Sequence, residues 1–159
     1  MLALEVGSFE KSAAKEAFEH TLEVIASLAV RLQDMGCAVG LATNGALTGG
    51  GFSVLPATRA PEQLPAILET LARLQTAQKG AIGPIMRQAM GSLRGVSCAY
   101  FSYQAGRAAA ETDKYCRQQN IPITFFVCRS DPESQAIRQK SKAGIHTLDE
   151  IRFQGNEPV

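Results

Sequence analysis

Residues 1–43 read MLALEVGSFEKSAAKEAFEHTLEVIASLAVRLQDMGCAVGLAT, and they set the architecture of the chain. The apolar run Met1–Val6 predicts a strand buried on both faces. Over residues 18–32 apolar positions recur every three or four residues, which indicates an amphipathic helix, and Gly36 is its expected left-handed cap. Cys37–Thr43 predicts a second buried strand. This order of strand, long helix and strand is typical of a parallel sheet.

The rest of the chain continues the alternation of helices and strands. Pro65 must lie in the first turn of its helix, where a missing N–H is tolerated. Asp131 followed by Pro132 predicts another helix start. The other expected elements are a short edge strand at 52–55, helices at 64–74, 82–93 and 108–119, strands at 96–101, 123–127 and 145–148, and a last helix that Gly144 ends. We therefore predict an α/β fold with a doubly wound, mostly parallel six-stranded sheet and helices on both faces.

Length and composition indicate one domain with no broad electrostatic field. The 159 residues are 45% hydrophobic, and 16 basic against 15 acidic residues leave a net charge of +1, which favours neither nucleic acid nor an anionic membrane as a partner. The longest strongly apolar stretch, Val24–Val30, is far shorter than the ~20 residues of a membrane span, and the N-terminus does not resemble a secretion signal. We expect a cytoplasmic domain without direct membrane contact.

Cysteines and histidines give no catalytic or metal-binding pattern. The four cysteines are widely spaced, so buried free thiols are expected rather than zinc ligands. His20 falls in the first helix and His146 in the last strand, and neither belongs to the loops that follow the strands. No Gly-x-Ser-x-Gly elbow occurs. We expect no catalytic residues and no cofactor.

The glycine-rich segment 45–51, GALTGGG, allows two interpretations. Clustered glycines allow backbone amides to approach an anion, so Thr43, Asn44 and this segment would serve a nucleotide-binding or metal-binding enzyme on a Rossmann-like sheet. The segment lacks the Lys-Ser/Thr pair of a P-loop and does not lead directly into a helix. A flexible hairpin between the second strand and its edge neighbour is the favoured interpretation.

Several segments, taken together, resemble one family. They are the first strand with its acidic residue, the long helix, and the segments VGLATNG at 39–45, LP at 55–56 and QLPAILETLARL at 63–74. The chain resembles the bacterial domain of unknown function fifty-eight family, whose C-terminal half is a von Willebrand factor A-like domain. The resemblance implies a strand order of 3-2-1-4-5-6 and a non-catalytic role in protein contacts. It also implies a MoxR-type AAA+ ATPase as partner and a parent protein anchored in the inner membrane.

Von Willebrand A domains often bind magnesium through Asp-x-Ser-x-Ser after the first strand. The same register here reads Glu5-Val6-Gly7-Ser8-Phe9, in which two of the three ligand positions lack a side-chain oxygen. Where the family pattern has an aspartate after the strand ending at Phe101, this chain has a serine, a tyrosine and a glutamine. We expect a degenerate metal site that binds no metal, with Glu5 and Ser8 as its residual candidates.

Ligands of open α/β sheets bind beyond the carboxyl ends of the strands, where the strand order reverses. We expect a protein partner to contact the loops at this edge, through Ser8, Phe9, Asn44, Tyr103 and Gln104. The domain is expected to span residues 1–152, with a flexible tail at 153–159. Because the first core strand starts at Met1, we also expect the chain to be the C-terminal fragment of a longer protein.

Overall fold

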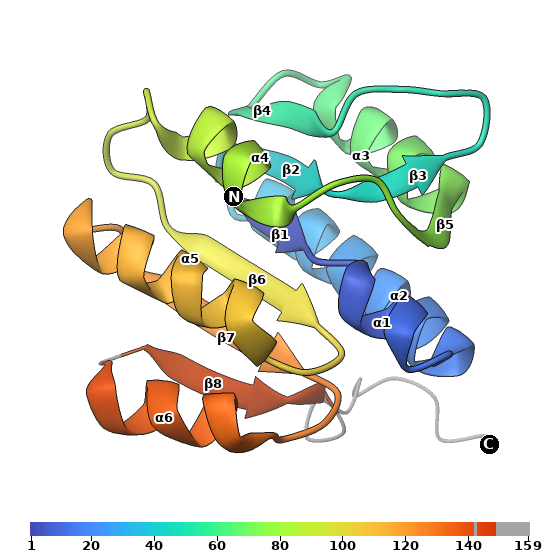
Figure 1. Ribbon diagram of the computed structural model, residues 1–159. Coiled ribbons are helices and arrows are strands. Elements are labelled where there is room, and N and C mark those ends of the chain that lie inside the picture. The colour runs from blue at the N-terminus through green and yellow to red at the C-terminus, as the bar shows by residue number, and fades with distance from the viewer. Residues whose placement is uncertain (142, 149–159) are drawn as a thin grey trace, which may run out of the picture.

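A computed structural model describes residues 1–141 and 143–148 (Figure 1). The larger sheet has six strands: β1 Leu2–Leu4, β2 Val39–Thr43, β4 Val54–Thr58, β6 Cys98–Ser102, β7 Ile123–Val127 and β8 Gly144–Thr147. A second sheet pairs β3 (Gly45–Leu47) with β5 (Leu74–Gln78). The helices are α1 Gly7–Lys11, α2 Lys15–Asp34, α3 Gln63–Arg73, α4 Ile82–Met90, α5 Gly106–Gln118 and α6 Pro132–Lys140.

The larger sheet runs β4-β2-β1-β6-β7-β8, and only β4 is antiparallel to its neighbour. Numbered along the chain, these six strands lie in the order 3-2-1-4-5-6, as expected. The predicted α/β class and mostly parallel six-stranded sheet are therefore confirmed. The same order occurs in dinucleotide-binding folds, so it describes a Rossmann-like sheet without assigning a family.

The helices cover the two faces of the sheet (Figure 1). Because side chains alternate along β1, Ala3 packs on the face under α4, α5 and α6, whereas Leu2 and Leu4 pack on the face under α1, α2 and α3. Both layers are apolar, and the β1 side chains are buried on both faces. A strand placed in this way is continuously hydrophobic, as the run at Met1–Val6 indicates.

Local backbone signals are confirmed at several helix ends. Gly36 has a φ of +76° directly after the end of α2. Asp131 caps α6 in a capping box with Ser134, and Pro132 opens the helix. Pro65 is the third residue of α3, within the first turn as required. Side-chain chemistry at these positions acts within a few residues, which is why sequence patterns locate them.

Three expectations about local structure are wrong. Gly7–Lys11 is a short helix, α1, rather than a loop. Leu74–Gln78 follows α3 directly and forms β5 instead of a connecting segment, because it pairs with β3. Gly144 begins β8, and α6 already ends at Lys140. The expected domain boundary at 152 and the tail at 153–159 lie outside the described residues. None of the described helices is long and apolar enough to cross a membrane.

Candidate functional site at the carboxyl edge of the sheet

The strand order reverses between β1 and β6, so the carboxyl ends of β1, β2 and β6 meet at one place. Leu4 pairs with Thr43 on one side and with Phe101 on the other. The residues that come next are Glu5 and Asn44, while Ser102 is the last residue of β6. This is where ligands of doubly wound sheets bind.

Asn44 is fully buried and joins three segments of the chain. Its Oδ1 accepts a hydrogen bond from the backbone N–H of Val6 at 2.8 Å, and its Nδ2 donates to the carbonyl of Gly80 at 3.1 Å. Its own carbonyl accepts from the N–H of Lys79 at 2.6 Å. Asn44 therefore connects the end of β1 to the end of β2 and to the segment before α4. Its side chain is used inside the fold.

Glu5 and Ser8, the residual metal candidates, also bond within the chain. Only 6% of Glu5 is exposed, and its Oε2 accepts a hydrogen bond from the backbone N–H of Ser8 at 3.1 Å. The Ser8 hydroxyl accepts from the backbone N–H of Tyr103 at 3.0 Å. Both side chains thus hold α1 against the ends of β1 and β6. Within the described residues, no group of three or more His, Cys, Asp or Glu side chains is placed to bind a metal ion.

The small sheet closes the edge above β1 and β2, as Figure 1 shows beyond the tips of these two strands. A Cβ atom on Gly45 would lie 2.6 Å from Leu74 Cδ2 and 2.9 Å from Val6 Cγ2, so a larger residue would push these side chains aside. On the outside, Glu10 Oε2 accepts from the N–H of Gln78 at 2.7 Å and joins α1 to β5. The small sheet and α1 therefore cover the ends of β1 and β2, where Glu5 and Asn44 are buried.

The five predicted contact residues are only partly brought to the surface. Phe9 is fully buried, with its ring centroid 5.4 Å from that of Phe18 and 5.8 Å from that of Tyr103, and Asn44 is fully buried as well. Phe9 and Asn44 therefore provide no exposed contact area, because α1 turns Phe9 into the core. Ser8, Tyr103 and Gln104 are half-buried and remain at the open part of the edge.

Two buried hydroxyls lie on the same face of β6, that of Tyr100 in the predicted core strand and that of Ser102, which was expected in the loop after it. Among the described residues, Ser102 Oγ has no hydrogen-bond partner, and Tyr100 OH makes no hydrogen bond of ordinary geometry, although the Thr112 side chain lies close enough to favour its ionised form. Burial raises the pKa of Tyr100 well above its usual value, and the neighbouring charge of Glu5 adds to this effect. The sequence offers one signal for this pair of hydroxyls: side chains two residues apart in a strand point to the same face, so residues 100 and 102 lie on one face of β6. Tyr100 stays protonated and is a poor acid or base.

The thiols and histidines show no catalytic arrangement. Cys37, Cys98 and Cys116 are free thiols, as expected; Cys98 and Cys116 are buried, whereas Cys37 and Cys128 are only half-buried. Burial raises the pKa of Cys98 to about 12 and that of Cys116 to about 11, so both thiols are inert at neutral pH. His20 lies 3.8 Å from Glu23 on α2, and the ring of His146 stacks on Phe126.

The first three residues of the glycine-rich segment form β3, which pairs with β5 instead of making the favoured hairpin between β2 and its edge neighbour, and the rest forms a turn held by α3. Gly49 and Gly50 have φ angles of +78° and +75°. The Arg73 guanidinium donates to the carbonyl of Thr48 at 2.9 Å and also to the carbonyl of Gly50. The segment leads into β4 and not into a helix, so no helix dipole supports an anion there.

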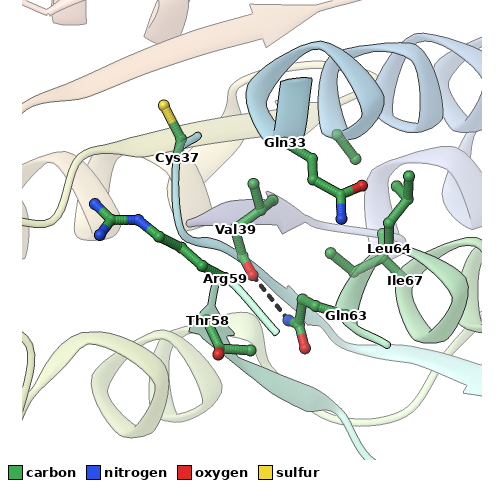
Figure 2. A pocket seen from close by; sticks show the side chains of 9 residues that line it. Gln33, Cys37, Val39, Thr58, Arg59, Gln63, Leu64 and Ile67 are labelled. Atoms are coloured by element: carbon green, nitrogen blue, oxygen red, sulfur yellow. Dashed lines mark hydrogen bonds between the residues drawn. The ribbon is translucent and has the colours of Figure 1, made fainter. Parts of the chain in front are cut away.

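Three hollows lie at the opposite, amino edge of the sheet. The cavity in Figure 2, between α2, α3 and the start of β2, has a volume of about 10 Å³, and the Gln63 amide beside it already donates to the carbonyls of Val39 and Pro56. A larger apolar groove of about 570 Å³ runs from Leu28 and Leu32 to Phe126. A second groove of about 570 Å³ lies at the starts of β7 and β8, beside Arg117 and Lys140. None of the three hollows contains the sequence-predicted site residues. In comparisons with protein-family models, with curated proteins and with solved structures, the chain matches none of them.

Proposed function

We propose that this chain is a non-catalytic protein-interaction domain of the domain of unknown function fifty-eight family, with a von Willebrand factor A-like fold. The observation that carries the proposal is that the carboxyl edge is covered at the ends of β1 and β2 and open only beside β6. Three side chains lie where a metal or nucleotide would be held: Glu5, Ser8 and Asn44. Each forms hydrogen bonds with backbone groups of the chain instead. An edge that is covered in this way has little room for a small ligand but still offers an outer surface.

The open part of that surface consists of Ser8, Tyr103 and Gln104. An aromatic ring with a polar tip beside an amide is a composition common in protein interfaces. Tyr103 packs against buried Phe9, so its ring is held in place before a partner arrives. We propose the MoxR-type AAA+ ATPase that the family resemblance implies as the partner, with the parent protein anchored in a membrane.

The rival, a nucleotide- or metal-binding enzyme, has less support. Its residues Thr43 and Asn44 are buried, and the Thr43 hydroxyl accepts a hydrogen bond from the N–H of Gly45 at 3.1 Å. The glycine segment is held by Arg73 through its carbonyl groups. Neither part of the required site is free to meet a substrate.

Site-specific photocrosslinking in cells tests the proposal. The full chain carries the photoreactive residue benzoylphenylalanine either at position 103 or, as control, at position 35, where Met35 is 64% exposed at the end of α2. We expect a discrete protein adduct from position 103 and none from position 35. Adducts of equal yield at both positions, or none at 103, contradict the interaction surface. Mass spectrometry of the adduct tests the ATPase assignment, which any other partner overturns.

A further inference from the structure

Phe52 is the most exposed large apolar side chain of the described residues, with 81% of its surface in contact with solvent. It lies in the loop between β3 and β4, next to the three glycines at 49–51. A single exposed apolar residue is ordinary on a protein surface. The loop that carries Phe52 is not ordinary, because several hydrogen bonds hold it in one conformation.

The loop is held from α3 and β5. Arg73 donates to the carbonyls of Thr48 and Gly50, and the Gln75 amide donates to the Thr48 hydroxyl at 3.0 Å. Within the turn, the N–H of Gly50 donates to the carbonyl of Leu47 at 3.0 Å. Holding a loop in its bound shape lowers the entropy that binding would cost. The aromatic ring is thus presented by a preformed turn.

The loop belongs to the same edge of the sheet as Tyr103. Val54 pairs with Ala42 near the carboxyl end of β2, and the carbonyl of Ser53 accepts from the N–H of Thr43 at 2.9 Å. Phe52 therefore enters β4 from the carboxyl edge. Only β2 and β1 lie between β4 and β6, so at ~4.8 Å per strand the two strands are roughly 14 Å apart. A partner that contacts both Phe52 and Tyr103 must therefore also extend over the small sheet and α1, which lie between them (Figure 1).

The chemistry around Phe52 narrows the kind of partner. Residues 47–58, LTGGGFSVLPAT, contain no charged side chain. The guanidinium of Arg73, which lies against this loop, is paired with the carboxylate of Glu69 at 3.3 Å and bonds to carbonyl groups of the loop. Strand addition along β4 is disfavoured, because Pro56 has no N–H and its carbonyl accepts from the Gln63 amide at 2.9 Å. The partner must engage the ring itself. We infer that Phe52 is a preformed anchor that inserts into an uncharged apolar pocket of the protein partner, an inference that rests on the proposed interaction function.

The test measures how Phe52 affects the adduct formed from benzoylphenylalanine at position 103. In the full chain, Phe52→Ser should lower the adduct yield at least tenfold, as expected for a buried aromatic anchor. Phe52→Tyr should restore most of the yield, and Met35→Ser, which removes another exposed apolar side chain, should leave it unchanged. Arg73→Gln should reduce the yield while Phe52 is still present, because the loop is no longer held. Circular dichroism checks that each variant is folded.

The outcomes separate this inference from the proposed function. An adduct at position 103 that persists in Phe52→Ser overturns the anchor and leaves the interaction surface intact. If position 103 gives no adduct, the proposed surface is wrong. Benzoylphenylalanine at position 52 then tests the anchor by itself. The anchor is supported if position 52 gives an adduct that is lost in Arg73→Gln, and it is overturned otherwise. An adduct with twice the mass of the chain would show that the pocket belongs to a second copy of this chain, and it would overturn the inference that the partner is a different protein. Absence of adducts from both positions overturns both ideas.

Discussion

Individual buried polar side chains at the carboxyl edge differ in how much they contribute to the stability of the fold. Asn44 satisfies the N–H of Val6 and the carbonyl of Gly80, whereas the Ser102 hydroxyl has no partner. Removing one member of a buried hydrogen bond leaves the other unsatisfied, which costs ~1–3 kcal/mol, but removing an unpaired hydroxyl costs no hydrogen bond. The same type of truncation should therefore have opposite consequences at these two positions.

We expect Asn44→Ala to lower the free energy of unfolding by about 2 kcal/mol and Ser102→Ala to leave it unchanged or raise it by up to about 1 kcal/mol. Urea unfolding followed by circular dichroism measures both. Equal losses in the two variants would mean that the hydroxyl of Ser102 is satisfied in solution.

Asp131 gives a prediction with a pH dependence. Partial burial alone would raise its pKa, but hydrogen bonds from Ser134 and from the backbone N–H groups of Gly106, Ser134 and Ala105 outweigh burial and lower the pKa. A folded-state pKa below the unfolded value of about 3.9 stabilises the protein above that pH, and the contribution is lost as the pH falls through the folded pKa.

The neutral isostere Asp131→Asn isolates this contribution. At pH 7 the wild type should be more stable than the variant by about 1 kcal/mol, a value typical of a helix cap in contact with solvent. The difference should shrink below about pH 4. Thermal unfolding of both proteins between pH 2.5 and 7 measures it, and a difference that stays constant with pH would refute the carboxylate's role.

Among the helices, α2 has apolar residues spaced so that one side of the helix packs against the sheet while the other side faces solvent. Ile25 is fully buried in the core between α2 and the sheet, whereas Val30, five residues later, is 38% exposed. The same substitution at the two positions therefore compares burial within one helix. An unpaired carboxylate in the core costs several kcal/mol, while one at the surface changes little.

We expect Ile25→Asp to abolish cooperative thermal unfolding and Val30→Asp to melt within a few degrees of the wild type. Differential scanning calorimetry distinguishes them. A normal melting transition for Ile25→Asp would show that this part of α2 is not against the sheet.

For the molecule as a whole, the covered carboxyl edge predicts how the protein responds to small ligands. The Glu5 carboxylate and the Ser8 hydroxyl take part in bonds to the chain, and Gly7 and Phe9 supply no side-chain oxygen. We expect calorimetric titration with Mg²⁺ or Mn²⁺ to show no stoichiometric binding, and millimolar ATP to leave the melting temperature unchanged. A saturable shift with any of the three would restore the enzyme hypothesis, because a ligand above its Kd stabilises the folded state.

The order of elements and much of the core could be predicted from sequence patterns. Alternation of apolar runs, the helical spacing at 18–32 and the cap at Asp131 depend on residues that are near one another along the chain. Each such pattern reports which face of a local element is buried, and these faces are enough to specify an α/β sheet. Tyr103 and Gln104 lie at the carboxyl edge, as expected of residues that directly follow a buried strand.

The state of the candidate site depends on contacts between distant segments. Residues 45–47 pair with residues 74–78, and α1 packs beside them, so Phe9 and Asn44 are buried instead of exposed. Nothing periodic in the segment after Arg73 marks it as a strand, because its partner lies across the intervening β4 and α3. Local patterns encode burial, whereas pairing between remote segments is selected by the free energy of the assembled fold. For that physical reason, the closing of the carboxyl edge emerges only once the chain has folded.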